Sequence, residues 1–232
     1  MMHSLPEGYR ALVIGASGAI GSALLQQLQS DPRCALALGV SRQSAPGLDL
    51  LSEASIASCA QALAALGPFH VVLDATGALT VKGRGPEKRL DELDAVHLLA
   101  ALQLNAVGPG LLLKHFVPLL ASGQRVIWGK LSARVGSIQD NRKGGWYGYR
   151  AAKAALNMLL QTASIEVTRR RPLAVVAALQ PGTVQSALSQ PFVGDDAMHP
   201  EEAARRLLAV LDALEPTGRA QFVDHQGHSI PW

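Results

Sequence analysis

The chain contains little of what binds metals in proteins. It has only two cysteines in 232 residues, Cys34 and Cys59, and they lack metal-ligand spacing. We expect both cysteines to be small, buried free thiols, which are typical of a reducing, cytoplasmic location. His225 and His228 stand three apart near the C-terminus and are expected to be exposed tail histidines, so we predict no metal site.

Charge is scarce as well. Only 17% of the residues are charged, and the net charge is +3. The chain has no run of five basic residues, and its densest cluster, residues 169–171, fits the last turn of a helix, where cations interact favourably with the helix dipole. We therefore expect no nucleic-acid partner.

Long uninterrupted apolar runs are missing. Residues 1–7 lack the apolar core of a signal peptide. The apolar run around Leu111 is broken by a glycine, a lysine and two prolines, namely Gly108, Lys114, Pro109 and Pro118. A membrane-spanning helix needs about 20 consecutive, mainly apolar residues, so we predict no membrane span.

What is abundant is short apolar segments, within a chain that is 48% hydrophobic. This suits one well-buried domain over 1–232, and no linker or repeat divides it. Apolar runs alternate with helical patterns, which predicts an α/β fold: a doubly wound parallel sheet of the Rossmann type with helices on both faces. Residues 187–200, rich in loop-forming residues, are expected to form a substrate loop.

The expected elements follow the chain closely. Strands are predicted at 11–14, 35–40, 69–74, 125–131, 173–179 and 221–223. Helices are predicted from 22, over 52–66, 90–101 and 102–120, from the segment around 149 to about 169, and over 200–214, with Ser52 as an N-cap and a bend or break at 108–109.

A glycine-rich turn follows the first strand and opens the first helix. Such a turn lets backbone N–H groups approach a pyrophosphate, and the helix dipole favours the anion. Glycines also serve plain turns, but the strand–turn–helix order favours dinucleotide binding. The predicted contacts in this turn are Gly15, Ser17, Gly18, Ala19, Ile20 and Gly21.

Ligands of open parallel sheets bind outside the carboxyl ends of the strands. The residues that follow the predicted strands should therefore share one edge: Gly15, Arg42, Thr76, Ser132 and Pro181.

Tyr149 and Lys153 are four residues apart in a helical pattern, so their side chains should lie on one helix face. A free tyrosine has a pKa of about 10, and a nearby cation lowers it by stabilising the phenolate. A tyrosine tuned in this way passes a proton to or from an alcohol or carbonyl oxygen. An ordinary helix that carries these two residues by chance is the alternative.

The position that selects between nicotinamide cofactors lies about 20 residues beyond the glycines. Ser41 stands there, and neither it nor its neighbours is acidic. Arg42 and the hydroxyls of Ser41 and Ser44 are suited to a 2′-phosphate, which predicts a preference for NADP(H) over NAD(H). The alternative is that Arg42 is a solvated surface residue.

In this order, the motifs resemble those of the short-chain dehydrogenase/reductase family over nearly the whole chain. The ordered set is the glycine turn, Asp49, Ala75–Gly77, Asn105, Ser132, Tyr149 with Lys153, and 181–184. The segments 132–138, 140–142 and 144–147 and the ending 230–232 resemble the C-factor (C-signal) subgroup, which is similar to carbonyl reductases.

The resemblance implies a role for each matching residue. Tyr149 would be the acid-base, Lys153 would lower its pKa and hold the nicotinamide ribose, and Ser132 would bond the substrate oxygen. Asn105 would disturb its helix and hold a water that relays protons, or else would only satisfy a buried backbone group. Further cofactor contacts would come from Asp49, Leu50, Ala75, Thr76, Gly77, Pro181, Gly182 and Val184.

The sequence departs from the family pattern at several points. The glycine spacing is unusual, with Ala19 in place of the middle glycine, and Asp74 begins the segment that precedes Gly77. Ala133 stands where many members have the catalytic serine, which leaves Ser132 as first choice and Ser137 as second. Trp146 and Tyr147 are predicted either to stack on a substrate or to pack a loop.

The predicted activity is reversible reduction of a small-molecule ketone or aldehyde by nicotinamide hydride. The alternative is a dinucleotide-binding signalling or sensor protein with little or no turnover. The resemblance further implies a homodimer or homotetramer, and the small and apolar residues around 151–160 support burial of that helix on most sides.

Overall fold

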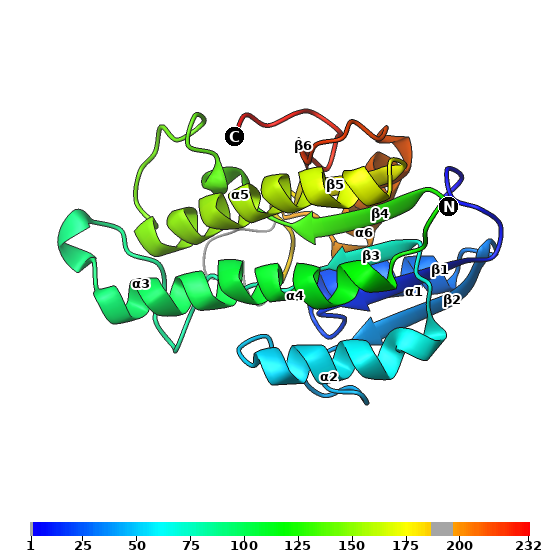
Figure 1. Ribbon diagram of the computed structural model, residues 1–232. Coiled ribbons are helices and arrows are strands. Elements are labelled where there is room, and N and C mark those ends of the chain that lie inside the picture. The colour runs from blue at the N-terminus through cyan, green and yellow to red at the C-terminus, as the bar shows by residue number, and fades with distance from the viewer. Residues whose placement is uncertain (1, 187–196) are drawn as a thin grey trace.

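One six-stranded parallel sheet organises the structure, a computed structural model that describes residues 2–186 and 197–232. The strand order is β2-β1-β3-β4-β5-β6 (Figure 1). The strands are β1 (Tyr9–Ile14), β2 (Cys34–Val40), β3 (Val71–Asp74), β4 (Val126–Leu131), β5 (Ala174–Gln180) and β6 (Gln221–Asp224). The chain therefore reverses direction along the sheet after β2, which places a crevice at the carboxyl ends of β1 and β3.

Helices cover both faces of this sheet, as predicted for a doubly wound fold. The helices are α1 (Ala19–Gln29), α2 (Glu53–Leu63), α3 (Ala95–Leu102), α4 (Gly108–Phe116), α5 (Tyr147–Arg170) and α6 (Pro200–Ala213). Leu24 of α1 and Leu207 of α6 pack in one apolar core, whereas α2, α4 and α5 contribute Ile56, Leu112 and Leu156 to the other.

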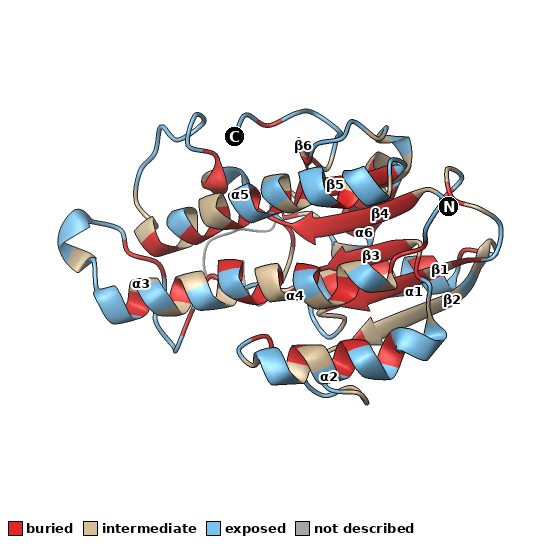
Figure 2. Ribbon diagram, viewed as in Figure 1, coloured by how far each residue is buried: buried red, intermediate tan, exposed pale blue. Residues whose placement is uncertain are grey.

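The strands are mainly apolar because, outside the edge strand β2, most of their residues are buried. In β1, Leu12 and Ile14 belong to one core and Ala11 and Val13 to the other, as the two-residue period of a strand requires. All of β3 and β4 is buried, and Figure 2 shows the centre of the sheet as continuously buried. The pattern explains why short apolar runs identified the strands in the sequence.

The predicted interruption near residues 108–109 is a widened turn in a continuous helix. A π-helical turn, Gln103–Val107, joins α3 to α4. Pro109 has no N–H to donate to the carbonyl of Asn105, so the regular bonding pattern is lost there. The whole segment Ala95–Leu119 is long and apolar enough to cross a membrane by length and composition. It lies here over the sheet, with Leu112 and Phe116 fully buried in the core.

Two local expectations have different outcomes. Ser52 caps α2 as predicted, because its side chain accepts a hydrogen bond from Ser55 N. The predicted helix over 90–101 is wrong at its start, where a short 3₁₀ turn, Leu90–Glu92, is separate from α3. Asp94 caps α3 through a hydrogen bond from His97 N, and an N-cap residue adopts the extended backbone that ends the preceding turn.

Candidate active site

The glycine turn between β1 and α1 has the geometry of a phosphate-binding turn. Gly15 has φ +84°, and a Cβ at Gly21 would lie 2.2 Å from the carbonyl oxygen of Gly15. The first turn of α1 is thus packed directly on the backbone of the preceding loop, which only glycine permits. Gly18 is the N-cap of α1, and its side-chain-free backbone leaves the helix N-terminus open to an anion.

A cavity of about 690 Å³ opens in front of this turn, at the carboxyl edge of the sheet. Residues that follow β2, β3, β4 and β5 line it, which confirms the shared edge predicted for Arg42, Thr76, Ser132 and Pro181. Other predicted contacts in the lining are Gly18, Ala19, Ile20, Gly21, Ala75, Gly77, Tyr149, Lys153, Gly182 and Val184. A cavity of this shape and lining fits an extended dinucleotide beside a small substrate.

Some predicted cofactor contacts do not line the cavity. Gly15 is one of them, and a Cβ on it would lie 3.1 Å from the backbone N of Thr76. Ser41 Oγ accepts a hydrogen bond from Gln43 N, and Asp49 Oδ1 accepts one from Leu51 N. The side chains of these two residues therefore act in local turns. Leu50 is buried against Gly108, and Ser17 is exposed.

Tyr149 and Lys153 lie on one face of α5, with the Lys153 Nζ 5.6 Å from the centroid of the Tyr149 ring. The Lys153 ammonium donates a 3.0 Å hydrogen bond to the carbonyl of Leu131 at the end of β4. Burial raises the pKa of Tyr149 to about 12. Burial, and secondarily the charge of Lys130, lowers the pKa of Lys153 to about 7, while Asp74 opposes that lowering.

The two candidate serines have different surroundings. Ser132 lines the cavity, and its hydroxyl donates a 2.7 Å hydrogen bond to Asn157 Oδ1. Ser137 is bonded to the C-terminus instead, because its hydroxyl donates to the carbonyl of Trp232 at 3.5 Å. Ser137 is not among the residues described as lining the cavity.

Asn105 is fully buried in the π-turn and bonds both backbone groups of Ala78, at 3.0 Å each. It thereby fixes the chain directly after Gly77. A Cβ on Gly77 would lie 3.1 Å from Asn105 Oδ1 and 3.4 Å from Lys153 Nζ. The glycine therefore leaves a gap between the amide and the ammonium.

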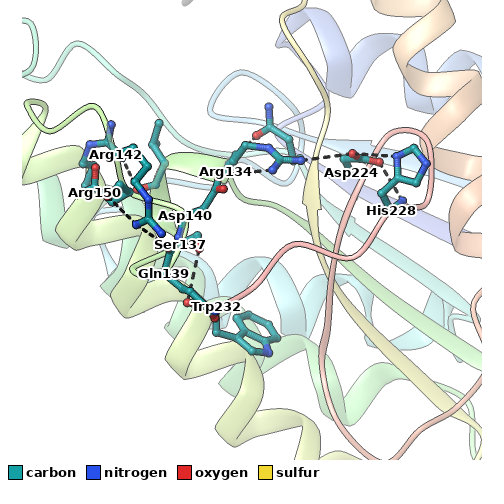
Figure 3. A network of polar contacts seen from close by, with 12 residues as sticks. Arg134, Ser137, Gln139, Asp140, Arg142, Arg150, Asp224, His228 and Trp232 are labelled. Carbon is teal, nitrogen blue, oxygen red and sulfur yellow. Dashed lines mark hydrogen bonds and ion pairs between the residues drawn. The ribbon is translucent and has the colours of Figure 1, made fainter.

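A network of polar contacts follows β4 and reaches the cavity at Arg134 (Figure 3). Arg134 lines the cavity and pairs with Asp140 and Asp224, each at 3.4 Å. Arg150, on α5, donates to carbonyls of the 135–145 segment, and Gln139 N donates to the carbonyl of Trp232. The segment 135–145 is thus tied to β6, α5 and the C-terminus, and of its residues only Val135 is among those that line the cavity.

Several lining residues were not predicted from the sequence, among them Leu79, Leu131, Arg134, Val135 and Gln180. Most of them stand at or just after a strand end, the signal that identified their neighbours. Trp146 also lines the cavity and packs edge-on against Tyr149, with ring centroids 6.3 Å apart. Among the described residues, no group of three possible ligands could hold a metal ion.

A glycine turn opening a helix, a cavity at the switch in strand order and a tyrosine–lysine pair facing it define a dinucleotide-binding oxidoreductase fold. No family model matches the chain. It is 31% identical to C-signal of Myxococcus xanthus over 167 residues, which are 72% of this chain and 94% of that relative. It is 30% identical to 1-hydroxy-2-glutathionyl-2-methyl-3-butene dehydrogenase of Rhodococcus sp. strain AD45, over 95% of this chain and 98% of that enzyme.

Solved structures share the fold. An NADPH-bound carbonyl reductase from chicken fatty liver has a TM-score of 0.84 at 20% identity and covers 99% of this chain, with 97% of its own chain matched. Carbonyl reductase Sniffer of D. melanogaster has a TM-score of 0.82 at 21% identity, with 97% and 99% covered. The chain belongs to the short-chain dehydrogenase/reductase family.

The close packing of Gly21 on the Gly15 carbonyl can be tested by substitution. Gly21→Ala would force its methyl group into the Gly15 carbonyl, whereas a Cβ at Gly18 would lie 3.5 Å from the same oxygen, an ordinary contact. We expect Gly21→Ala to lower the free energy of unfolding by about 1–3 kcal/mol, measured by urea titration. Gly18→Ala is the matched control, and equal losses in both variants would contradict the packing described for Gly21.

Proposed function

We propose that the protein interconverts a carbonyl and an alcohol by hydride transfer with NADP(H), with Tyr149 as the acid-base. The observation that carries the proposal is the Tyr149–Lys153 pair, which faces the same cavity as the glycine turn. The residues fit a dinucleotide, since the packing on Gly15 and Gly21 keeps the turn free of side chains. When bound, the nicotinamide supplies or accepts the hydride.

In the reduction, the Tyr149 hydroxyl gives its proton to the carbonyl oxygen. Burial raises the pKa of Tyr149 to about 12, so its phenolate needs a cation beside it. Lys153 supplies that charge when protonated. The gap at Gly77 supports a water between Asn105 and Lys153 that returns a proton to the site. Ser132, which lines the cavity, is the proposed hydrogen-bond donor to the substrate oxygen.

A preference for NADP(H) is supported by Arg42. It follows β2, lines the cavity and makes no hydrogen bond or ion pair with the residues that the structure describes. The nearest acidic residues before and after Arg42 in the sequence, Asp31 and Asp49, have other partners. Asp31 accepts hydrogen bonds from Met2 N and the Tyr9 hydroxyl, and Asp49 accepts one from Leu51 N in a local turn. A free guanidinium without a competing carboxylate favours a 2′-phosphate.

The second candidate, a dinucleotide-binding signalling protein with little turnover, is favoured by one observation. The Ser132 hydroxyl is bonded to Asn157, and Ala133 stands where many family members have the catalytic serine. Oxidation of NADPH with a panel of ketones, aldehydes and quinones distinguishes the two. Turnover of any of them supports the enzyme, and NADPH binding without turnover supports the sensor.

Tyr149→Phe tests the acid-base. The variant keeps the ring and its contact with Trp146 but loses the proton. We expect kcat to fall by about 10²–10⁴-fold, with the Kd for NADPH nearly unchanged in a fluorescence titration. Tyr147→Phe, on the same helix, is the matched control. Wild-type turnover in Tyr149→Phe would remove Tyr149 from the chemistry.

The choice of serine is tested by a pair of variants. Ser132→Ala should reduce kcat/KM by about tenfold, the equivalent of one hydrogen bond. Ser137→Ala should leave kcat/KM close to wild type, because its hydroxyl faces the C-terminal carbonyl of Trp232. A larger loss in Ser137→Ala than in Ser132→Ala would reverse the assignment.

Arg42→Ala tests the cofactor preference. A hydrogen bond to a charged group contributes about 1.5–3 kcal/mol, so NADPH affinity should fall about 10- to 100-fold while NADH affinity barely changes. Arg33→Ala, an arginine paired with Glu7 away from the cavity, is the control. Equal losses for both cofactors, or tighter NADH binding by the wild type, would assign the protein to NAD(H).

We further propose that the protein is a homodimer or homotetramer. The faces of α3, the π-turn and α5 present Leu99, Val107 and Met158, which are 65%, 50% and 66% exposed, around a hollow of about 610 Å³. Apolar side chains at this density favour burial by a second copy. Light scattering at micromolar concentration should give a multiple of the 24.4 kDa mass, and a monomeric mass would contradict the proposal.

A further inference from the structure

A buried ion pair lies in the sheet directly beneath the cavity. Lys130 of β4 and Asp74 of β3 are register partners at the carboxyl ends of their strands. Their side chains are 1% and 0% exposed, and Lys130 Nζ lies 3.0 Å from Asp74 Oδ1. Charged residues are almost never fully buried without such a partner, and every other position of β3 and β4 is apolar or small.

The pair holds the segment that lines the cavity after β3. Lys130 Nζ donates to the carbonyl of Thr76 at 2.6 Å and lies 3.2 Å from its hydroxyl. Asp74 Oδ1 accepts from Thr76 N at 2.9 Å and from the Thr76 hydroxyl at 2.6 Å. All the polar groups of Thr76 therefore bond to these two residues, which fixes Thr76 from below the cavity.

The same pair acts on Lys153. The charged groups that influence the Lys153 ammonium are Lys130 from β4, which repels it, and Asp74 from β3, which attracts it. Its own helix adds the Tyr149 phenol, and the π-turn adds the neutral amide of Asn105. The site thus buries two ammonium groups against one carboxylate.

We propose that Lys130 is a positioning residue: held by Asp74, it fixes the Thr76 turn at the side of the cavity where the cofactor would bind. This deepens the proposed function and rests on the proposed binding of a dinucleotide in this cavity.

The pH dependence follows from the direction of each effect. The pKa of Lys153 is about 7, lowered first by burial and then by Lys130. Its positive charge is complete below that pH and is lost as pH rises through it. Reduction needs that charge, so the rate should fall on the alkaline side of neutrality. Removal of the Lys130 charge should raise the pKa of Lys153 and move the fall to higher pH.

The test uses two variants of the full chain. Lys130→Met keeps the side-chain length and removes the charge. Asp74→Asn combined with Lys130→Met removes both charges and leaves no unpaired buried ion, so it serves even where the single variant folds poorly. Lys114→Met, at an exposed lysine paired with Glu53, is the matched control.

The first readout needs no turnover. In protein with ¹³C- and ¹⁵N-labelled lysine, the Lys153 Cε resonance, assigned with Lys153→Met, is titrated by NMR. We expect the midpoint to rise by about one pH unit in Lys130→Met, by less in the double variant because the attraction of Asp74 is also lost, and not at all in Lys114→Met.

The second and third readouts are the pH profile of kcat and the Kd for NADPH. The alkaline fall in kcat should move up with the NMR midpoint, and NADPH affinity should weaken about tenfold in Lys130→Met. Unchanged NADPH affinity in both variants, or failure of both to fold, would assign the pair to stability alone and overturn the proposal. Absence of turnover in the wild type, with NADPH binding weakened in the variants, would overturn the proposed function instead.

Discussion

Burial of charge at the carboxyl edge of the sheet is the constraint on which the site depends. Parallel strands end together, so whatever follows them shares one edge. Lys153, buried on α5, satisfies its ammonium on the carbonyl of Leu131 at the end of β4. That bond fixes α5 relative to the sheet, and Tyr149 one turn earlier is oriented by the same contact. The proposed acid-base and the packing of α5 on the sheet therefore share this contact.

Burial shifts the pKa values of Tyr149 and Lys153 in opposite directions. It raises the pKa of Tyr149 and lowers that of Lys153, because a low-dielectric site disfavours any charge. A cationic lysine beside a phenolate is consequently not the resting state of the protein at alkaline pH. The Tyr-x-x-x-Lys spacing alone does not reveal this effect of burial on the two pKa values.

The sequence was sufficient for the fold because local patterns agree with the global arrangement. The short apolar runs of β1 and β4 are typical of strands buried on both faces. The glycines after β1 leave no room for a side chain, as the structure shows at Gly21. The separate start of α3 was missed because the residues before Asp94 also have a helical pattern, whereas the Asp94 cap begins a new helix after them. Lys130 was missed for a deeper reason: a lysine in a buried strand is explained only by its partner, and register with Asp74 is a tertiary property.

One departure from the family pattern lies at the wall of the cavity. Where a second serine is common, Ala133 leaves room, and the next residue, Arg134, lines the cavity while it bonds to carboxylates from two directions. Its backbone N–H also bonds Gln180 at the end of β5. The guanidinium is held by its neighbours, so this wall is rigid and polar, whereas Leu79, Val135 and Trp146 make the rest apolar. For the proposed carbonyl substrates, selectivity would then come from shape on the apolar side and from hydrogen bonding to the exposed Arg134 on the other, since a site that bonds a polar group of its substrate rejects an analogue without that group more strongly than a pocket rejects a missing methylene.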